Sequence, residues 1–228
     1  MKGLFIALEG PDGSGKSTMI KGLEEYFKKK GMDVLITREP GGTPIGEAIR
    51  KILLDNRNRS MFPETEALLY AASRGQHVRE KILPAIKAGK VVLCDRFILS
   101  SLAYQGVGRG LGIEEVRMIN DFAIKGIRPD LTLFYHIDPE TTLQRKTRKR
   151  GGDRLESEGI DFHRKVYLGY LEILKKYSNN VKIIDATKTK KEVLNQSIYC
   201  IEEFLKGRKS NETYNRHSPG PGRTKFTR

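Results

Sequence analysis

The sequence contains little cysteine and no tryptophan. Two of its 228 residues are cysteine, at Cys94 and Cys200. A chain of this length buries about 70% of the surface that its unfolded form would expose, so its core needs neither a disulfide framework nor a structural metal. Cys94 closes an apolar run and Cys200 lies in a helical pattern. We therefore expect both to be small core residues, not a bridge or a metal pair.

Long apolar runs are also lacking. The first apolar stretch, residues 4–8, is too short to span a bilayer and leads directly into a glycine-rich loop. This pattern predicts neither a membrane span nor a secretory leader. We expect a cytoplasmic protein with no membrane partner.

Acidic residues are outnumbered by basic ones, and the formal net charge is +14. Such an excess can indicate nucleic-acid binding, so its distribution matters. Residues 206–228 contain seven Lys or Arg against Glu212 alone, and a second basic cluster occupies residues 145–154. Because the charge is local, nucleic acid is not the expected partner. A nucleic-acid-binding protein stays open as the alternative from a different class.

Short apolar runs alternate with helical patterns along the chain. The runs predict buried strands over residues 3–9, 34–37, 91–94, 131–137 and 181–184. Helical spacing fills the intervals, with a kink or break expected at Pro84. This alternation predicts an α/β fold, a five-stranded parallel sheet with helices on both faces and active groups at the carboxyl ends of the strands.

Two regions of unequal character divide the chain. Residues 1–207 carry the strands and helices and are expected to form one domain. The segment from Lys206 onward is rich in Gly, Pro, Ser, Asn and basic residues and has no apolar periodicity. We expect residues 208–228 to be a basic, disordered tail.

A phosphate-binding loop follows the first strand. It fits the pattern Gly, four residues, Gly-Lys-Ser/Thr, between a strand and a helix, and a chance glycine-rich turn is the much weaker alternative. The ATP-binding residues it predicts are Gly10, Pro11, Asp12, Gly13, Ser14, Gly15, Lys16, Ser17 and Thr18. Lys16 is expected to reach the β and γ phosphates, and the Ser17 hydroxyl to ligate Mg²⁺. The loop alone does not distinguish a motor, a switch, an ATPase or a kinase.

Three further segments resemble the thymidylate kinase family, in the same order and over roughly residues 3–205. They are Arg38-Glu39-Pro40-Gly41-Gly42-Thr43, Leu68-Leu69-Tyr70-Ala71-Ala72-Ser73-Arg74, and residues 93–105 with Asp95, Arg96, Ser101, Tyr104 and Gln105. The resemblance implies a P-loop NTPase fold with an Arg-rich lid, ATP and Mg²⁺ as cofactors, dTMP as acceptor and a homodimer. Another nucleotide or nucleoside kinase of this fold stays open as an alternative.

Asp95 and Arg96 stand at the end of the third strand. That position suits Asp95 to hold Mg²⁺ opposite the phosphate loop, and suits Arg96 to clamp the acceptor phosphate. A surface ion pair or a strand-end cap is the alternative for this Asp-Arg pair.

The resemblance also assigns the acceptor site. Tyr70 would stack on thymine and Arg74, one helical turn later, would bond an exocyclic oxygen. Without the resemblance, the sequence would indicate a core aromatic residue at Tyr70 and a solvated charge at Arg74. Ser101 would read the base edge, Tyr104 would pack where a ribose hydroxyl would sit, and Gln105 belongs to the same dTMP motif. Glu39 would line the acceptor phosphate and metal region, unless it only forms a helix-entry turn.

The basic run over residues 145–156 resembles the family's lid. Members carry an arginine either in the phosphate loop or in the lid, and Gly13 fills the loop position here. The lid must then supply the transition-state charge, with Arg154 the first choice and Arg150 and Arg148 next. No general base is needed, because a phosphate monoester is largely dianionic near neutral pH. Consistent with this, none of the four histidines falls in a motif: His77, His136, His163 and His217.

Overall fold

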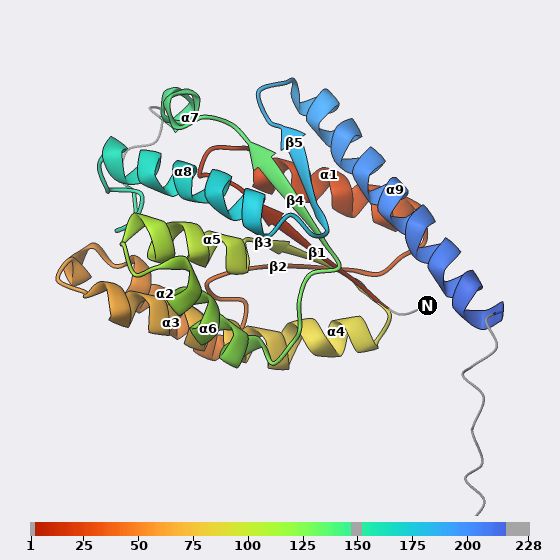
Figure 1. Cartoon of the computed structure of the whole chain (residues 1–228), viewed down its shortest axis with the longest axis horizontal. Coiled ribbons are helices and arrows are strands. Elements are labelled where there is room, and N and C mark those ends of the chain that lie inside the picture. The colour runs from red at the N-terminus through yellow and green to blue at the C-terminus, as the bar shows by residue number, and fades with distance from the viewer. Residues whose placement is uncertain (1–2, 147–151, 218–228) are drawn as a thin grey trace, which may run out of the picture.

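A computed structural model describes residues 3–146 and 152–217 (Figure 1). Its parallel sheet has five strands in the order β2-β3-β1-β4-β5. The strands are β1 (Leu4–Glu9), β2 (Val34–Arg38), β3 (Val91–Asp95), β4 (Leu131–His136) and β5 (Val181–Asp185). The predicted α/β fold and the positions of its strands are confirmed.

Helices cover both faces of the sheet (Figure 1). Alternate residues of β1 point to opposite faces: Leu4, Ile6 and Leu8 join one apolar cluster, and Phe5 and Ala7 join the other. The first face is covered by α1 (Lys16–Lys29) and α9 (Lys190–His217). The remaining helices are α2 (Pro44–Leu54), α3 (Pro63–His77), α4 (Leu83–Lys87), α5 (Ile98–Ser101), α6 (Ile113–Ile124), α7 (Pro139–Lys146) and α8 (Ile160–Lys176).

Shorter helical segments connect several of these elements. They are the 3₁₀ turn η1 (Asn56–Asn58) and the π-helical segments η2 (Val78–Ile82) and η3 (Leu102–Gly108). Segment η2 links α3 to α4 just before Pro84, where the amide of Leu83 bonds the carbonyl of Val78. A proline cannot donate within a helix, so the break predicted near Pro84 appears as this change of helical pitch.

The C-terminal segment differs in part from the expectation. Helix α9 continues to His217, so the first part of the segment expected to be disordered is helical. The sequence offers a reason, because no proline interrupts it before Pro219 and Gly207 alone is tolerated in a helix. Residues 218–228 lie outside the described part.

Neither cysteine forms a bridge, as predicted: Cys94 is buried and Cys200 half-buried. Among the described residues, no helix is both long and apolar enough to cross a membrane.

Candidate active site

A cavity of about 780 Å³ lies at the carboxyl ends of β1, β2 and β3. Its walls come from the phosphate loop, the segment after β2, helix α3, the segment after β3, and residues 152–156. Of the residues predicted from the sequence it brings together Asp12, Gly13, Gly15, Lys16, Ser17, Thr18, Glu39, Tyr70, Arg74, Asp95, Arg96, Ser101, Tyr104 and Gln105. Gly10, Pro11 and Ser14 belong to the same loop but do not line the cavity.

The phosphate loop depends on two glycines. Gly10 has φ 132°, and a Cβ there would lie 2.6 Å from the backbone oxygen of Tyr135. Gly15 has φ 91° and caps α1, which begins at Lys16. The loop therefore turns tightly between β1 and α1. The positive end of the α1 dipole lies at the cavity, which Gly15 and Lys16 line.

Lys16 is held inside this loop. Its Nζ donates to the carbonyl oxygens of Gly10 and Pro11, both at 2.9 Å, and only 6% of the residue is exposed. Burial, together with the nearby positive charge of Arg96, lowers the pKa of Lys16 to about 8. A bound phosphate would counter both effects.

Ser17 and Asp95 meet as the sequence predicts. Ser17 Oγ lies 3.5 Å from Asp95 Oδ2, to which it donates. The second oxygen, Asp95 Oδ1, is buried and no described residue donates to it. A hydroxyl and an unpaired carboxylate oxygen are ligands that hard divalent cations prefer, so this pair fits a metal ion.

Arg96 connects β3 to the phosphate loop. It has φ 68° directly after the strand. Its Nη2 lies 2.5 Å from Asp12 Oδ1, and its Nη1 donates to the carbonyl of Gly10 at 2.9 Å and to Ser100 Oγ at 2.9 Å. The guanidinium thus joins the phosphate loop to the segment after β3.

Tyr104 joins the same group. Its hydroxyl donates to Asp12 Oδ2 at 3.1 Å, and its ring lies edge-on to Phe162 at 6.1 Å. Arg96 lies over the ring, 5.3 Å from the centroid. Tyr104 is therefore fixed between the phosphate loop and the helix that carries Phe162.

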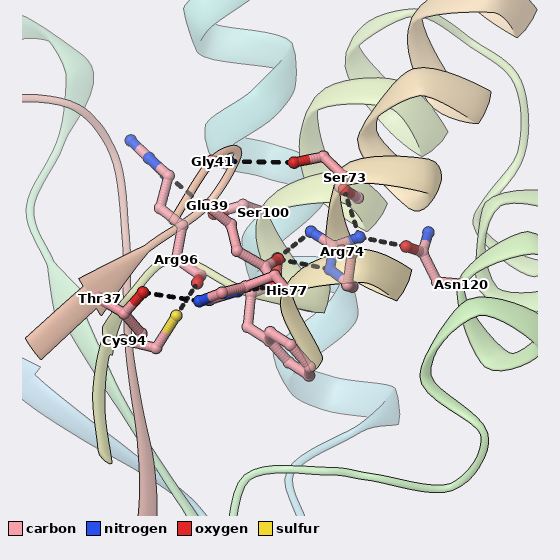
Figure 2. A network of polar contacts seen from close by, with 12 residues as sticks. Thr37, Glu39, Gly41, Ser73, Arg74, His77, Cys94, Arg96, Ser100 and Asn120 are labelled. Carbon is pink, nitrogen blue, oxygen red and sulfur yellow. Dashed lines mark hydrogen bonds and ion pairs between the residues drawn. The ribbon is translucent and has the colours of Figure 1, made fainter. Parts of the chain in front are cut away.

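Arg74 is a buried charge and not a solvated one, with 2% of it exposed. Nε donates to Glu39 Oε2 at 2.6 Å, and Nη2 to the carbonyl of Phe97 at 3.1 Å. Nη1 donates to Ser101 Oγ at 3.1 Å. It also donates to Asn120 Oδ1 (Figure 2). The guanidinium is held in one orientation on the cavity wall, beside Tyr70.

Comparison with known proteins identifies the family to which the chain is similar. The family model described as thymidylate kinase matches residues 8–198. The thymidylate kinase of Finegoldia magna is 58% identical over 87% of this chain and 96% of its own length. That of Geobacillus sp. is 53% identical over 91% of this chain and 100% of its own length, and that of Clostridium novyi 51% over 90% and 98%.

The chain belongs to the thymidylate kinase family. The surroundings of Glu39 extend beyond the cavity wall. Glu39 lines the cavity, but its carboxylate bonds Arg74 through Oε2 and His77 Nδ1 through Oε1, at 2.9 Å. His77 Nε2 in turn lies 2.6 Å from Thr37 Oγ1 (Figure 2). Both carboxylate oxygens of Glu39 are thus engaged by Arg74 and His77 on the cavity wall.

His77 was missed by sequence reasoning because it falls in no motif. One signal could have identified it: it follows Arg74 by three residues, which places both on one side of α3. His77 is fully buried, and both of its ring nitrogens have partners. It extends the network around Arg74 to β2.

Glu39, His77 and Cys94 also lie close enough to hold a metal ion. The carboxylate and the imidazole already have the partners described above, and Cys94 Sγ donates to the backbone oxygen of Arg96 at 3.1 Å. Burial raises the pKa of the Cys94 thiol well above its usual value, which disfavours the thiolate that binds metals. The arrangement suits a hydrogen-bonded core better than a metal centre.

Arg154 does not line the cavity. It is 4% exposed, its Nη2 lies 2.6 Å from Glu66 Oε2, and its Nε donates to the carbonyl of Leu53 at 2.8 Å. The other lid candidates, Arg148 and Arg150, lie outside the described residues. In this structure Arg154 anchors residues 152–156 to α2 and α3.

Two arginines that sequence reasoning missed face the same cavity. Arg38 ends β2 and pairs with Glu47 at 2.9 Å. Arg50 donates through Nη1 to the carbonyl of Pro40 at 2.9 Å. They add positive charge to a wall that would receive anionic substrates. The available signal was that Arg38 opens the Arg38–Thr43 motif and Arg50 lies in the helix that follows it.

Proposed function

We propose that this chain transfers the γ-phosphoryl group of ATP to dTMP, giving dTDP and ADP, as a cytoplasmic enzyme. The observation that carries the proposal is one cavity lined both by a phosphate loop and by the Tyr70 and Arg74 face of α3. Family membership, with relatives at 58% and 53% identity, supports dTMP as the acceptor.

On the donor side, the loop from Gly10 to Thr18 binds the ATP phosphates and Lys16 contacts the β and γ groups. Ser17 and Asp95 hold Mg²⁺, either directly or through water. The ion supplies neutralisation of charge on the phosphates. The unpaired Asp95 Oδ1 supports this assignment.

On the acceptor side, Tyr70 stacks on thymine, and Arg74, Ser101 and Gln105 read its polar edge. Arg96 and Glu39 line the region of the acceptor phosphate, and Tyr104 packs against the deoxyribose. No side chain needs to remove a proton, because the attacking phosphate oxygen is already largely anionic near neutral pH. Catalysis then consists of placing two anions in line and neutralising the charge between them.

For the remaining charge on the transferring group we assign the lid arginines Arg154, Arg150 and Arg148. Gly13 leaves the phosphate loop without an arginine of its own. Arg154 can serve this role only when it leaves Glu66, with which it pairs here.

We also propose a homodimer. Large apolar side chains are exposed on three neighbouring helices: Ile45 on α2, Leu68 on α3, and Met118 and Phe122 on α6. Helix α3 packs against both α2 and α6, so these side chains share one side of the molecule.

The test is a steady-state comparison of dTMP, dUMP, dCMP and AMP as acceptors with ATP. We expect the highest kcat/KM for dTMP. A preference for any other acceptor would overturn the assignment.

A further inference from the structure

We propose that Glu66 is a positioning residue for base selection. Its buried carboxylate fixes the side-chain amide of Gln105 so that the cavity wall offers a hydrogen-bond acceptor in addition to the donor of Arg74. This pair selects bases with an imide edge, thymine and uracil, against cytosine. The inference rests on the proposed function and names the feature that sets its base class.

Two rows of side chains face each other across the acceptor site. Glu66, Tyr70 and Arg74 follow at intervals of four residues on α3, and Ser101 and Gln105 have the same interval in the helical segment after β3. The rows are joined at both ends. Gln105 Nε2 donates to Glu66 Oε1 at 2.8 Å, and Arg74 Nη1 donates to Ser101 Oγ at 3.1 Å. Tyr70 stands between these joints.

The chemistry of Glu66 fixes the orientation of the amide. An ionised carboxylate accepts hydrogen bonds and donates none, so the NH₂ group of Gln105 must face it. The carbonyl oxygen of Gln105 is then turned away from Glu66, and no donor among the described side chains bonds it. Because Gln105 lines the cavity, that oxygen is the group it offers to a ligand.

Glu66 is itself held in place by two cations. It is fully buried, and its Oε2 lies 2.6 Å from Arg154 Nη2 and 3.2 Å from Arg109 Nη2. These two ion pairs hold the Glu66 carboxylate through Oε2, the oxygen opposite the one that accepts from Gln105 Nε2. The acceptor character of Gln105 is therefore imposed by charges outside the cavity wall.

Arg74 supplies the complementary donor. A guanidinium has five N–H groups, and four of those of Arg74 bond Glu39, Phe97, Ser101 and Asn120. One N–H on Nη2 remains for a ligand. Thymine and uracil present a carbonyl oxygen next to an N–H and match this pair, whereas cytosine presents an amino group next to a bare nitrogen and mismatches both.

The test compares kcat/KM for dTMP, dUMP and dCMP in the wild-type protein and in Glu66→Gln. An amide at position 66 can donate as well as accept, which lets Gln105 rotate and offer its NH₂ to the base. One lost base contact is worth about 1–3 kcal/mol, so we expect the dTMP-to-dCMP ratio to fall about tenfold or more. The dTMP-to-dUMP ratio should stay unchanged, because both share the imide edge.

The ratio within one variant is the readout because Glu66 also holds Arg154. If the substitution also disturbs Arg154, the resulting loss of turnover is the same for every acceptor and cancels in the ratio of their kcat/KM values. Glu64→Gln, an exposed change of the same charge on the same helix, is the matched control and should keep the wild-type ratio. An equal loss for all three acceptors in Glu66→Gln would overturn the proposal and leave Glu66 a structural residue.

A swap completes the test if Glu66→Gln melts below the assay temperature. In Glu66→Gln with Gln105→Glu, the carboxylate at position 105 can only accept, and the amide at position 66 supplies its donor. We expect this double variant to keep its preference for dTMP over dCMP, and a lost preference would count against the proposal. Failure of the wild-type protein to phosphorylate dTMP would instead reject the proposed function itself.

Discussion

Arg154 and Glu66 form a buried ion pair that joins the segment predicted to form a lid to helix α3. Their side chains are 4% and 1% exposed, and Nη2 lies 2.6 Å from Oε2. Helix α3 also carries Tyr70 and Arg74 on the cavity wall. The segment proposed to deliver charge to the transferring phosphate is therefore fastened to the element proposed to hold the base.

Arg154→Ala tests whether this arginine acts in catalysis. We expect kcat to fall by about 10³, as for arginine fingers, with the KM for ATP little changed. Loss of one partner of a buried pair also costs about 3–5 kcal/mol of stability, so the melting temperature should fall too. Arg59→Ala, which removes an exposed arginine, is the control. Normal turnover with a lowered melting temperature would make Arg154 an anchor only and shift the catalytic role to Arg148 or Arg150.

The lowered pKa of Lys16 predicts that ATP binding is accompanied by a pH-dependent uptake of protons. Its pKa is lowered to about 8 in the free protein, mainly by burial, and the negative charge of a triphosphate raises it again. Near pH 8.5 most of the free protein lacks this proton and must gain it on binding, whereas at pH 6.5 it is present in both states. Titration calorimetry in buffers of different ionisation enthalpy measures the uptake. Lys16→Arg stays charged throughout and should show none from this position; equal uptake in both proteins would refute the assignment.

The same shift affects stability. The unfolded chain holds the Lys16 proton up to about its ordinary pKa of 10.5, whereas the folded protein releases it near 8. Between these values the unfolded state binds more protons, so the contribution of Lys16 to the free energy of unfolding rises with pH in that window. Urea unfolding of wild type and Lys16→Met at pH 7 and pH 9.5 measures this difference. If the free energy of unfolding of the wild type, taken relative to that of Lys16→Met, decreased from pH 7 to pH 9.5, the predicted direction would be wrong.

His77→Leu tests the support behind Arg74. Removal of the imidazole leaves Glu39 Oε1 and Thr37 without their partner and loosens the carboxylate that holds Arg74. We expect the KM for dTMP to rise about tenfold while the KM for ATP changes little. His77→Gln keeps a donor near Glu39 and should recover part of the affinity. Parallel losses in both substrates would point to general destabilisation.

Phe122→Glu tests the proposed homodimer. Phe122 is 74% exposed on α6, and a buried carboxylate at an interface without a partner would be costly. We expect light scattering to give the dimer mass for wild type and the monomer mass for the variant. Leu168→Glu, at a 61% exposed position on α8, should remain dimeric. A wild-type monomer would exclude the interface.

The sheet and the phosphate loop could be predicted because their signals are local. The strand conformation is indicated by the apolar runs that end at Glu9 and Cys94. The turn of the loop is indicated by the glycines at positions 10 and 15. The Glu66–Arg154 pair could not be predicted in this way, because its members lie far apart in the sequence, Glu66 falls in no motif, and Arg154 is assigned to the lid. Burial by α2 and α3 turns them into partners, and only the assembled fold supplies that burial.

The most direct test of the proposed function follows the phosphoryl group itself. The protein is incubated with Mg²⁺, dTMP and ATP labelled at the γ phosphate, and the nucleotides are separated by chromatography. We predict label in dTDP with an equal amount of ADP formed, and no label transfer in Lys16→Met. Label released as inorganic phosphate, with dTMP unchanged, would contradict phosphoryl transfer to dTMP.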